Sequence, residues 1–206
     1  MAPGKDQEVE ELRRKLDSVS GDAAVRTLAR KAARLHRKDR TLAPLIELAH
    51  ALWKGKSESG KTAALEMVSS VGRRLEEDHW PELKGWVGDV RLAKHADLLG
   101  RDVLGWLVQR DRAWLRVLKH WALSKNKWER RVAVMAVVPR ARRMGDAEAA
   151  HDLCESLMGD ADPDVQEAVG LLLCESFEAD PGMTRDFLSR WDSRTHATLR
   201  PLLPLR

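Results

Sequence analysis

Several residue types are scarce in this sequence, and their scarcity excludes whole classes of protein. Tyrosine is absent and phenylalanine occurs only twice, so the aromatic side chains are mainly the eight tryptophans. The two cysteines, Cys154 and Cys174, form no C-x-x-C unit. A disulfide framework needs more cysteines than this, and a structural zinc site needs a denser set of ligands. We therefore expect two reduced, partly buried thiols.

Long apolar runs are missing as well. No stretch approaches the roughly eighteen apolar residues of a membrane-spanning helix, and residues 1–11 are charged rather than apolar. We therefore expect no membrane span, no signal peptide and a cytoplasmic location. His36, His95 and His120 lack the spacing of metal ligands, so we expect no metal and no cofactor.

Helix-forming residues are abundant. Ala, Leu, Arg, Glu and Lys dominate, and apolar residues recur at helical spacing, whereas no run alternates with a period of two. Residues 132–138 are the one strand-like stretch, but they continue from the preceding helical segment without a break, which favours a buried helix. Four breaks place capping residues before helical patterns: Ser20-Gly21-Asp22, Gly145-Asp146, Asp162-Pro163 and Asp180-Pro181.

A weak internal repeat supports a stacked arrangement of helices. Residues 128–134 align with residues 165–171, a period of 37 residues. Paired-helix repeats of the HEAT or armadillo kind have periods of this order. The sequence therefore predicts an all-α, HEAT/ARM-like helical-repeat solenoid that forms one domain over residues 1–206, in which residues 1–20 form a helix that can fray.

One motif matches a nucleotide-binding loop. Residues 55–62 fit G-x-x-x-x-G-K-[ST], the pattern of the phosphate-cradling P-loop. That chemistry needs a buried strand before the loop, so that backbone N–H groups converge on phosphate. Residues 44–53 instead have helical spacing and no β-branched run. We therefore expect a polar turn between two helices and no nucleotide cofactor.

Basic residues form a pattern that favours an anionic partner. Four of them are spaced four residues apart, as a continuous cationic stripe on one predicted helix: Arg26, Arg30, Arg34 and Lys38. Later clusters add Arg130 and Arg194. The net charge of +4 permits an anionic partner without requiring one, and any single cluster can be a solvated helix face balanced by acids. Together the clusters predict binding to a phosphate backbone with strong salt dependence.

The tryptophans have two possible roles. Trp106, Trp114 and Trp121 are expected to pack in the core. Trp86 and Trp128 flank the two segments that carry the candidate site, so either can form an aromatic wall against a sugar or base. The alternative for both is core packing, which is the commoner role of large aromatic side chains in helical proteins.

Two ionisable residues carry the functional signal. Asp97 lies in the run Ala96-Asp97-Leu98, and Arg131 lies 34 residues later in the segment 128–134. An acid and an arginine alone specify no reaction. However, residues 128–134 resemble the W-x-x-R-x-A-[IV] signature of the AlkD-type DNA alkylation repair family, and the run around Asp97 resembles its catalytic-aspartate segment. Residues 52–53, 165–170 and 193–195 resemble other family positions, so the resemblance covers roughly residues 40 to 200.

The resemblance implies an activity. Family members are HEAT-like repeats wrapped around duplex DNA, and they hydrolyse the N-glycosidic bond of N3- or N7-alkylated purines. By this resemblance Asp97 and Arg131 are the catalytic residues: Asp97 stabilises the positive charge of the sugar, and Arg131 holds a phosphate. We expect alkylated double-stranded DNA as the partner and a monomeric protein.

Two positions depart from the family pattern, because Ala93 and Leu171 stand where the family usually has tryptophan. The alternative function is therefore a non-catalytic helical-repeat module that binds DNA or protein partners.

Overall fold

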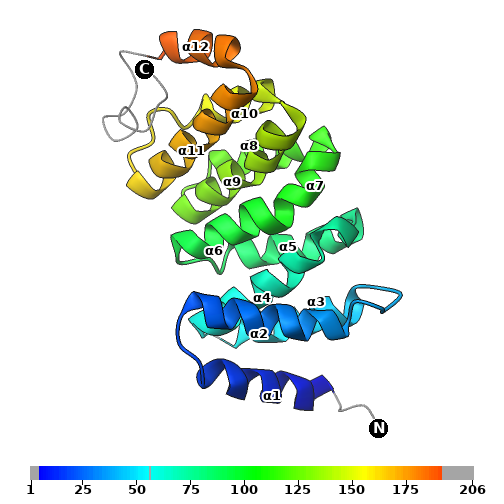
Figure 1. Cartoon of the computed structure of the whole chain (residues 1–206). Helices are drawn as coiled ribbons and strands as arrows, with labels where there is room; N and C mark the ends of the chain where they lie inside the picture. Colours follow the sequence, from blue (N-terminus) through cyan, green and yellow to red (C-terminus); the bar gives the residue numbers. More distant parts are fainter. Residues whose placement is uncertain (1–4, 56, 192–206) are drawn as a thin grey trace. The chain divides into compact units, whose positions relative to one another are not determined.

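Helices follow one another along the described part of the chain (Figure 1). The computed structural model describes residues 5–55 and 57–191, and within these residues it contains helices and turns but no strand. The all-α prediction is confirmed. The chain divides into two compact units, which we call the amino-terminal unit (Met1–Glu76) and the carboxy-terminal unit (Glu77–Arg206).

The amino-terminal unit is a group of paired helices. Its elements are α1 (Lys5–Asp17), α2 (Asp22–Leu35), α3 (Ala43–Lys54), α4 (Glu58–Ser70) and the 3₁₀ turn η1 (Gly72–Arg74). Both α2 and α3 pack against α4, whose central residues, such as Leu65, are fully buried. The apolar residues of α1 recur at helical spacing, so that Val9, Leu12 and Leu16 are buried together.

The P-loop-like motif lies in the turn between α3 and α4. The segment before the motif is the α-helix α3, and the motif's own residues from Glu58 onward form the first turns of α4. Ser57 is the N-cap residue of α4, and its Oγ accepts a hydrogen bond from the Gly60 N–H at 3.0 Å. The predicted helix over residues 44–53 is confirmed, and the small polar residues of the motif cap a helix.

The carboxy-terminal unit is built around one long helix, α9. Its elements in chain order are η2 (Glu77–His79), α5 (Trp80–Val87), α6 (Ala93–Asp97), the π-helical η3 (Leu98–Leu104), α7 (Gly105–Arg110), η4 (Arg112–Trp114), α8 (Leu115–Ala122), α9 (Lys127–Met144), α10 (Ala147–Cys154), α11 (Pro163–Ala179) and α12 (Pro181–Ser189). Helices from both sides in sequence pack against α9, namely α6, η3, α7, α8, α10 and α11.

The strand-like run of the sequence is the core of this unit. Residues 132–138 lie inside α9 and are all buried. A helix that is apolar on every face must be covered on every face, which explains why the run lacks the amphipathic pattern of a surface helix. The buried-helix prediction is confirmed. The helix ends at Gly145, whose φ of 67° lies in the left-handed region that favours glycine.

The predicted capping residues begin helices as expected. Three aspartates accept hydrogen bonds from backbone N–H groups of their own first turns: Asp146 from Ala149, Asp162 from Asp164, and Asp180 from Met183. Pro163 and Pro181 occupy the first helical positions, where a missing N–H costs nothing. At residues 20–22 the cap is Gly21, with a φ of 86°.

The internal repeat corresponds to two neighbouring helices. Residues 128–134 form the first turns of α9 and residues 165–171 form the first turns of α11, and these two helices pack against each other. Equivalent repeat positions therefore lie side by side near the starts of both helices. This placement is what allows a residue near the start of α9 to contact a residue near the start of α11.

The tryptophans of the carboxy-terminal unit are mostly packed. Trp80 stacks with Trp114, at a centroid distance of 4.1 Å, and with Trp121, at 5.7 Å. Trp121 is buried, whereas Trp106 and Trp114 are half-buried. The two thiols are free, with Cys154 buried and Cys174 half-buried.

Among residues 5–55 and 57–191, the helices are too short or too polar to span a bilayer.

Candidate functional site

Asp97 is held at the junction between an α-helix and a π-helix. It is the last residue of α6, and η3 follows it directly. π-Helical turns inside helices recur at functional sites. Gly100 brings this segment close to α9, because a Cβ at Gly100 would lie 2.7 Å from the Met135 Cβ and 2.7 Å from the Val132 carbonyl oxygen. The glycine therefore sets how near Asp97 comes to α9.

Arg131 of α9 binds Asp97 through both nitrogens of one guanidinium edge. Its Nε donates to Asp97 Oδ1 at 2.7 Å, and its Nη2 donates to Oδ2 at 2.9 Å. This bidentate geometry fixes the plane of the carboxylate as well as its position. The Arg131 side chain is 5% exposed and the Asp97 side chain is 25% exposed. A buried guanidinium therefore holds a carboxylate that is partly exposed to solvent.

The opposite edge of the Arg131 guanidinium binds α11. Nη1 donates to Glu167 Oε2 at 2.9 Å and also to the backbone carbonyl of Asp164. Glu167 is 65% exposed. One guanidinium thus joins α6, α9 and α11, and four of its five N–H groups are engaged in hydrogen bonds. Burial alone would lower the pKa of Arg131, but Asp97 and Glu167 outweigh burial and raise that pKa above its ordinary value.

A second arginine lies close to Asp97, at Arg101 in η3. Its Nε and Nη2 donate to the two carboxylate oxygens of Asp102 at 3.1 and 2.9 Å. The hydrogen bonds that Arg101 donates to Asp102 raise the pKa of Arg101, burial opposes this rise, and the charges of Asp102 and Asp97 add to it. From the sequence, Arg101 was a possible structural partner of Asp97 but not a predicted site residue, because a single arginine four residues after an aspartate forms neither a cluster nor a stripe.

Glu167 was missed for a different reason. The internal repeat aligns Glu167 with Arg130 and not with Arg131, so it did not indicate that Glu167 is an acidic partner of Arg131. Opposite charge is the signal that could have identified it. The repeat predicts that the segments forming α9 and α11 are neighbours, so an acid near the start of one can pair with an arginine near the start of the other.

The cationic stripe is present on α2 but is shorter than predicted. Arg26 and Arg30 both bind the buried carboxylate of Glu66 on α4, at 2.8 and 3.3 Å, and their side chains stay about half exposed. Arg34 is exposed on the same helix. The prediction that Lys38 continues the stripe on the same helix is wrong, because α2 ends at Leu35 and residue 38 lies in the following turn. The helical spacing therefore ends before Lys38, and the stripe consists of three arginines.

Arg130 has a fixed set of partners. Its Nε and Nη2 bind Asp160 at 2.6 and 3.1 Å, and its Nη1 donates to the carbonyl of Ser124 at 2.9 Å. Arg130 therefore ties the start of α9 to the loop before α11. Arg194, the other predicted DNA contact outside the stripe, lies outside the described residues.

The two tryptophans predicted as a wall differ in their exposure. Trp86 is 1% exposed, and its Nε1 donates to Glu82 at 3.4 Å, so its role is the alternative one of core packing. Trp128 is half-buried at the start of α9, with Lys127 Nζ 4.5 Å from its ring centroid. Leu171, which takes the place of a family tryptophan, is 39% exposed on α11, one turn after Glu167.

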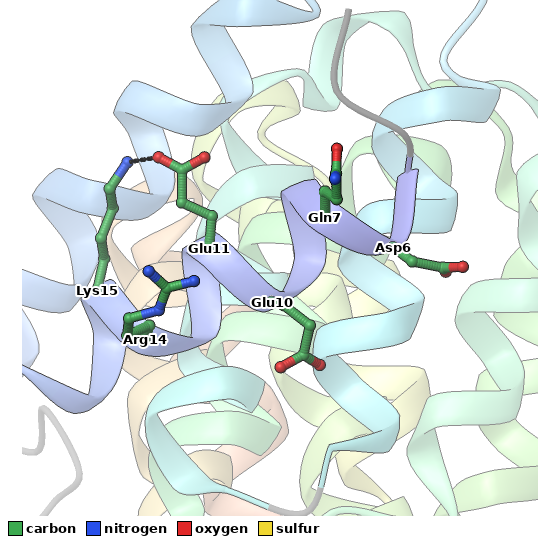
Figure 2. A pocket seen from close by; sticks show the side chains of 6 residues that line it. All are labelled: Asp6, Gln7, Glu10, Glu11, Arg14 and Lys15. Carbon is green, nitrogen blue, oxygen red and sulfur yellow. Dashed lines mark hydrogen bonds and ion pairs between the residues drawn. The ribbon is translucent and has the colours of Figure 1, made fainter.

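One hollow on the amino-terminal unit is lined by polar side chains that do not converge. Figure 2 shows the side chains around it, all from α1, pointing away from the helix in different directions. A binding site needs polar groups that converge, and the interaction drawn there is the ion pair between Glu11 and Lys15. In the described part of the chain, no group of three or more histidine, cysteine, aspartate or glutamate side chains is placed to hold a metal ion.

Known families and structures resemble this chain over most of its length. A family described as "DNA alkylation repair enzyme" matches residues 22–202. The structure of AlkD2 from Streptococcus mutans is 14% identical, with a TM-score of 0.72 and coverage of 97% of this chain and 95% of that one. The structure of smu.31 from Streptococcus mutans UA159 is also 14% identical, with a TM-score of 0.70 and 95% coverage of both chains. No curated protein sequence matches. These structures confirm the AlkD-like HEAT-repeat fold.

Proposed function

Since the chain belongs to the family of DNA alkylation repair enzymes, we propose that it is a DNA glycosylase that hydrolyses the N-glycosidic bond of N3- or N7-alkylated purines in duplex DNA. The observation that carries this proposal is the Asp97 carboxylate, which is partly exposed and held by a buried arginine on both of its oxygens. A fixed, partly exposed negative charge is suited to a substrate that becomes positive as it reacts.

Asp97 acts on the sugar. As the bond between C1′ and the base nitrogen breaks, the electron pair leaves with the base, so a cationic alkylated base departs neutral and the sugar becomes positive. The Asp97 carboxylate stabilises that developing charge. A water molecule then forms the new bond to C1′ and gives up its proton to Asp97 or to solvent. No step needs a cofactor.

Arg131 acts through Asp97. The sequence assigned it to a phosphate, but its guanidinium is buried and most of its N–H groups already bind Asp97, Asp164 and Glu167. Preorganising a carboxylate avoids the cost of orienting it during the reaction. We therefore assign Arg131 as a positioning residue, and we assign phosphate contacts to the stripe of Arg26, Arg30 and Arg34, which is exposed on α2.

The second candidate function is a non-catalytic module that binds DNA. The replacement of two family tryptophans by Ala93 and Leu171 favours it, because aromatic faces also stabilise a developing positive charge. The experiment that separates the two functions is an excision assay on duplex DNA containing N7-methylguanine, with the unmodified duplex as the control. Release of free base above the spontaneous rate supports the glycosylase. Binding to both duplexes without release of base supports the module.

A further inference from the structure

Glu167 is a carboxylate of the site to which the proposed reaction assigns no role. It lies on α11 and is mostly exposed, and its carboxylate accepts a hydrogen bond from Arg131 Nη1 at 2.9 Å. It is thus a second carboxylate on the guanidinium that holds Asp97.

The charges of these three residues decide what the site attracts. Asp97 and Arg131 alone form a neutral pair, and a neutral pair offers little net attraction to a cation. With Glu167 the three residues carry a net charge of −1. Because the Arg131 guanidinium lies between the two carboxylates and is buried, its positive charge is shared by both and does not cancel Asp97 alone.

The neighbouring charges leave this balance negative. On η3, Arg101 is paired with Asp102. On α9, Lys127 binds two acids at the start of α11, with Nζ 2.6 Å from Asp164 and 3.4 Å from Asp162. Arg101 and Lys127 therefore each have at least one acidic partner, and Glu167 is the exposed carboxylate of the group that contacts Arg131.

We propose that Glu167 is a positioning residue that gives the Asp97 site its preference for a positively charged ligand, namely a cationic sugar or a cationic alkylated base. It does so by sharing Arg131 with Asp97, which leaves net negative charge facing the ligand. This inference rests on the proposed function for the identity of the ligand, but its physical content is cation preference, which binding alone can measure.

The test compares two abasic-site analogues in otherwise identical DNA duplexes. One carries a pyrrolidine, whose ring nitrogen is positively charged in place of the anomeric carbon, and the other carries a neutral tetrahydrofuran. The ratio of their dissociation constants isolates cation preference from backbone binding. We expect the wild type to bind the pyrrolidine duplex more tightly than the tetrahydrofuran duplex. In Glu167→Gln this preference should fall about tenfold, which is the effect of removing one nearby charge from a partly screened site.

Matched variants separate charge from structure. Gln at position 167 can still accept the hydrogen bond from Arg131, so a merely structural role predicts no change in the ratio. Glu167→Asp keeps the charge and should retain most of the preference. Glu178→Gln removes an exposed acid from the same helix, but about 16 Å further along its axis, and should leave the ratio at the wild-type value.

The outcomes distinguish this inference from the proposed function. A wild type without cation preference, or a Glu167→Gln variant with the full wild-type ratio, overturns the inference even if methylated base is released. A Glu167-dependent preference in a protein that releases no base supports the inference and leaves the glycosylase proposal refuted.

Discussion

At the scale of single residues, Arg131 is the side chain on which the site depends. It is the buried partner of two acids and a backbone carbonyl, and it lies on α9, the central helix of the carboxy-terminal unit. The bidentate geometry of arginine suits this position, and removing one member of a buried ion pair leaves its partners buried without compensation.

The Arg131→Ala variant should therefore lose stability as well as activity. We expect the free energy of unfolding to fall by about 2 to 4 kcal/mol, a value reduced from that of a fully buried pair because both acids reach solvent. Urea denaturation measures this change. The control is Arg142→Ala on the same helix, whose side chain is mostly exposed beside Glu175 and should contribute less than about 0.5 kcal/mol. Equal losses in the two variants would contradict a special role for Arg131.

At the scale of elements, the approach of η3 to α9 places Asp97. Gly100 lies where any Cβ would meet the backbone and a side chain of α9 at 2.7 Å. Neither α9 nor η3 can yield freely, because both are buried there. The distance between Asp97 and Arg131 is therefore set by a buried glycine that is not itself part of the ion pair.

Gly100→Ala should push these elements apart. We expect a loss of about 1 to 3 kcal/mol in the free energy of unfolding, as for other overpacked cores, together with slower base excision. Gly85→Ala, in α5, is the control, because a Cβ there meets nothing within 4 Å and alanine is the better helix former. A Gly100→Ala protein as stable and active as wild type would show that close packing does not place Asp97.

The contact of α12 with its neighbours contains a buried histidine. His151 of α10 lies 2.8 Å from Ser176 Oγ and 3.1 Å from Thr184 Oγ1, measured from its Nε2, and stacks on Phe187. Burial lowers the pKa of His151 below its ordinary value of 6.5, and the charge of Arg190 lowers it further, while Asp180 and Asp152 oppose the shift.

The carboxy-terminal unit should therefore lose stability in mild acid. Below pH 6.5 the unfolded chain binds a proton at this position that the folded chain resists, so the free energy of unfolding falls as the pH drops through this range. Denaturation at about pH 7.5 and pH 5.5 measures the change. His151→Gln should reduce it, whereas His120→Gln, at an exposed histidine of α8, should not. An unchanged pH dependence in His151→Gln would contradict the assignment.

At the scale of the whole molecule, local signals in the sequence predicted most of the fold. Helical spacing, the aspartate caps and the continuous run at 132–138 are properties of neighbouring residues, and all three agree with the structure. The end of α2 was not predicted correctly, because Lys38 continues the four-residue spacing of the arginines although the helix stops at Leu35.

The site itself was only partly predictable. Asp97 and Arg131 were chosen by resemblance to a family, and their contact across 34 residues depends on packing between α6 and α9. The bonds of Glu167 and Asp164 to Arg131 depend on the register of α11 against α9, which spacing along the chain does not determine. The same applies to Glu66, whose burial under Arg26 and Arg30 no sequence pattern indicated.

The proposed binding to DNA should depend steeply on salt, because it rests on contacts with phosphates. Three phosphate contacts from α2 predict a slope near −2.7 for the logarithm of affinity against that of salt concentration, or about a 40-fold loss between 50 and 200 mM. Arg34→Gln leaves the Glu66 pairs intact and should reduce the slope by about 0.9. The control is Lys31→Gln on α2, where Lys31 borders a hollow shared with residues of α1. A flat salt response, or equal slopes in the two variants, would contradict the assignment of the stripe.

A single-turnover excision assay on N7-methylguanine duplex tests whether the Asp97 carboxylate stabilises the sugar as the base leaves. Asp97→Asn keeps the shape of the side chain and removes its charge, and Asp152→Asn, at an exposed pair with Lys119, controls for charge elsewhere. We expect wild type and Asp152→Asn to release the base, and Asp97→Asn to bind the duplex but release the base at least ~10²-fold more slowly. Release by Asp97→Asn at the wild-type rate would contradict this role of the carboxylate.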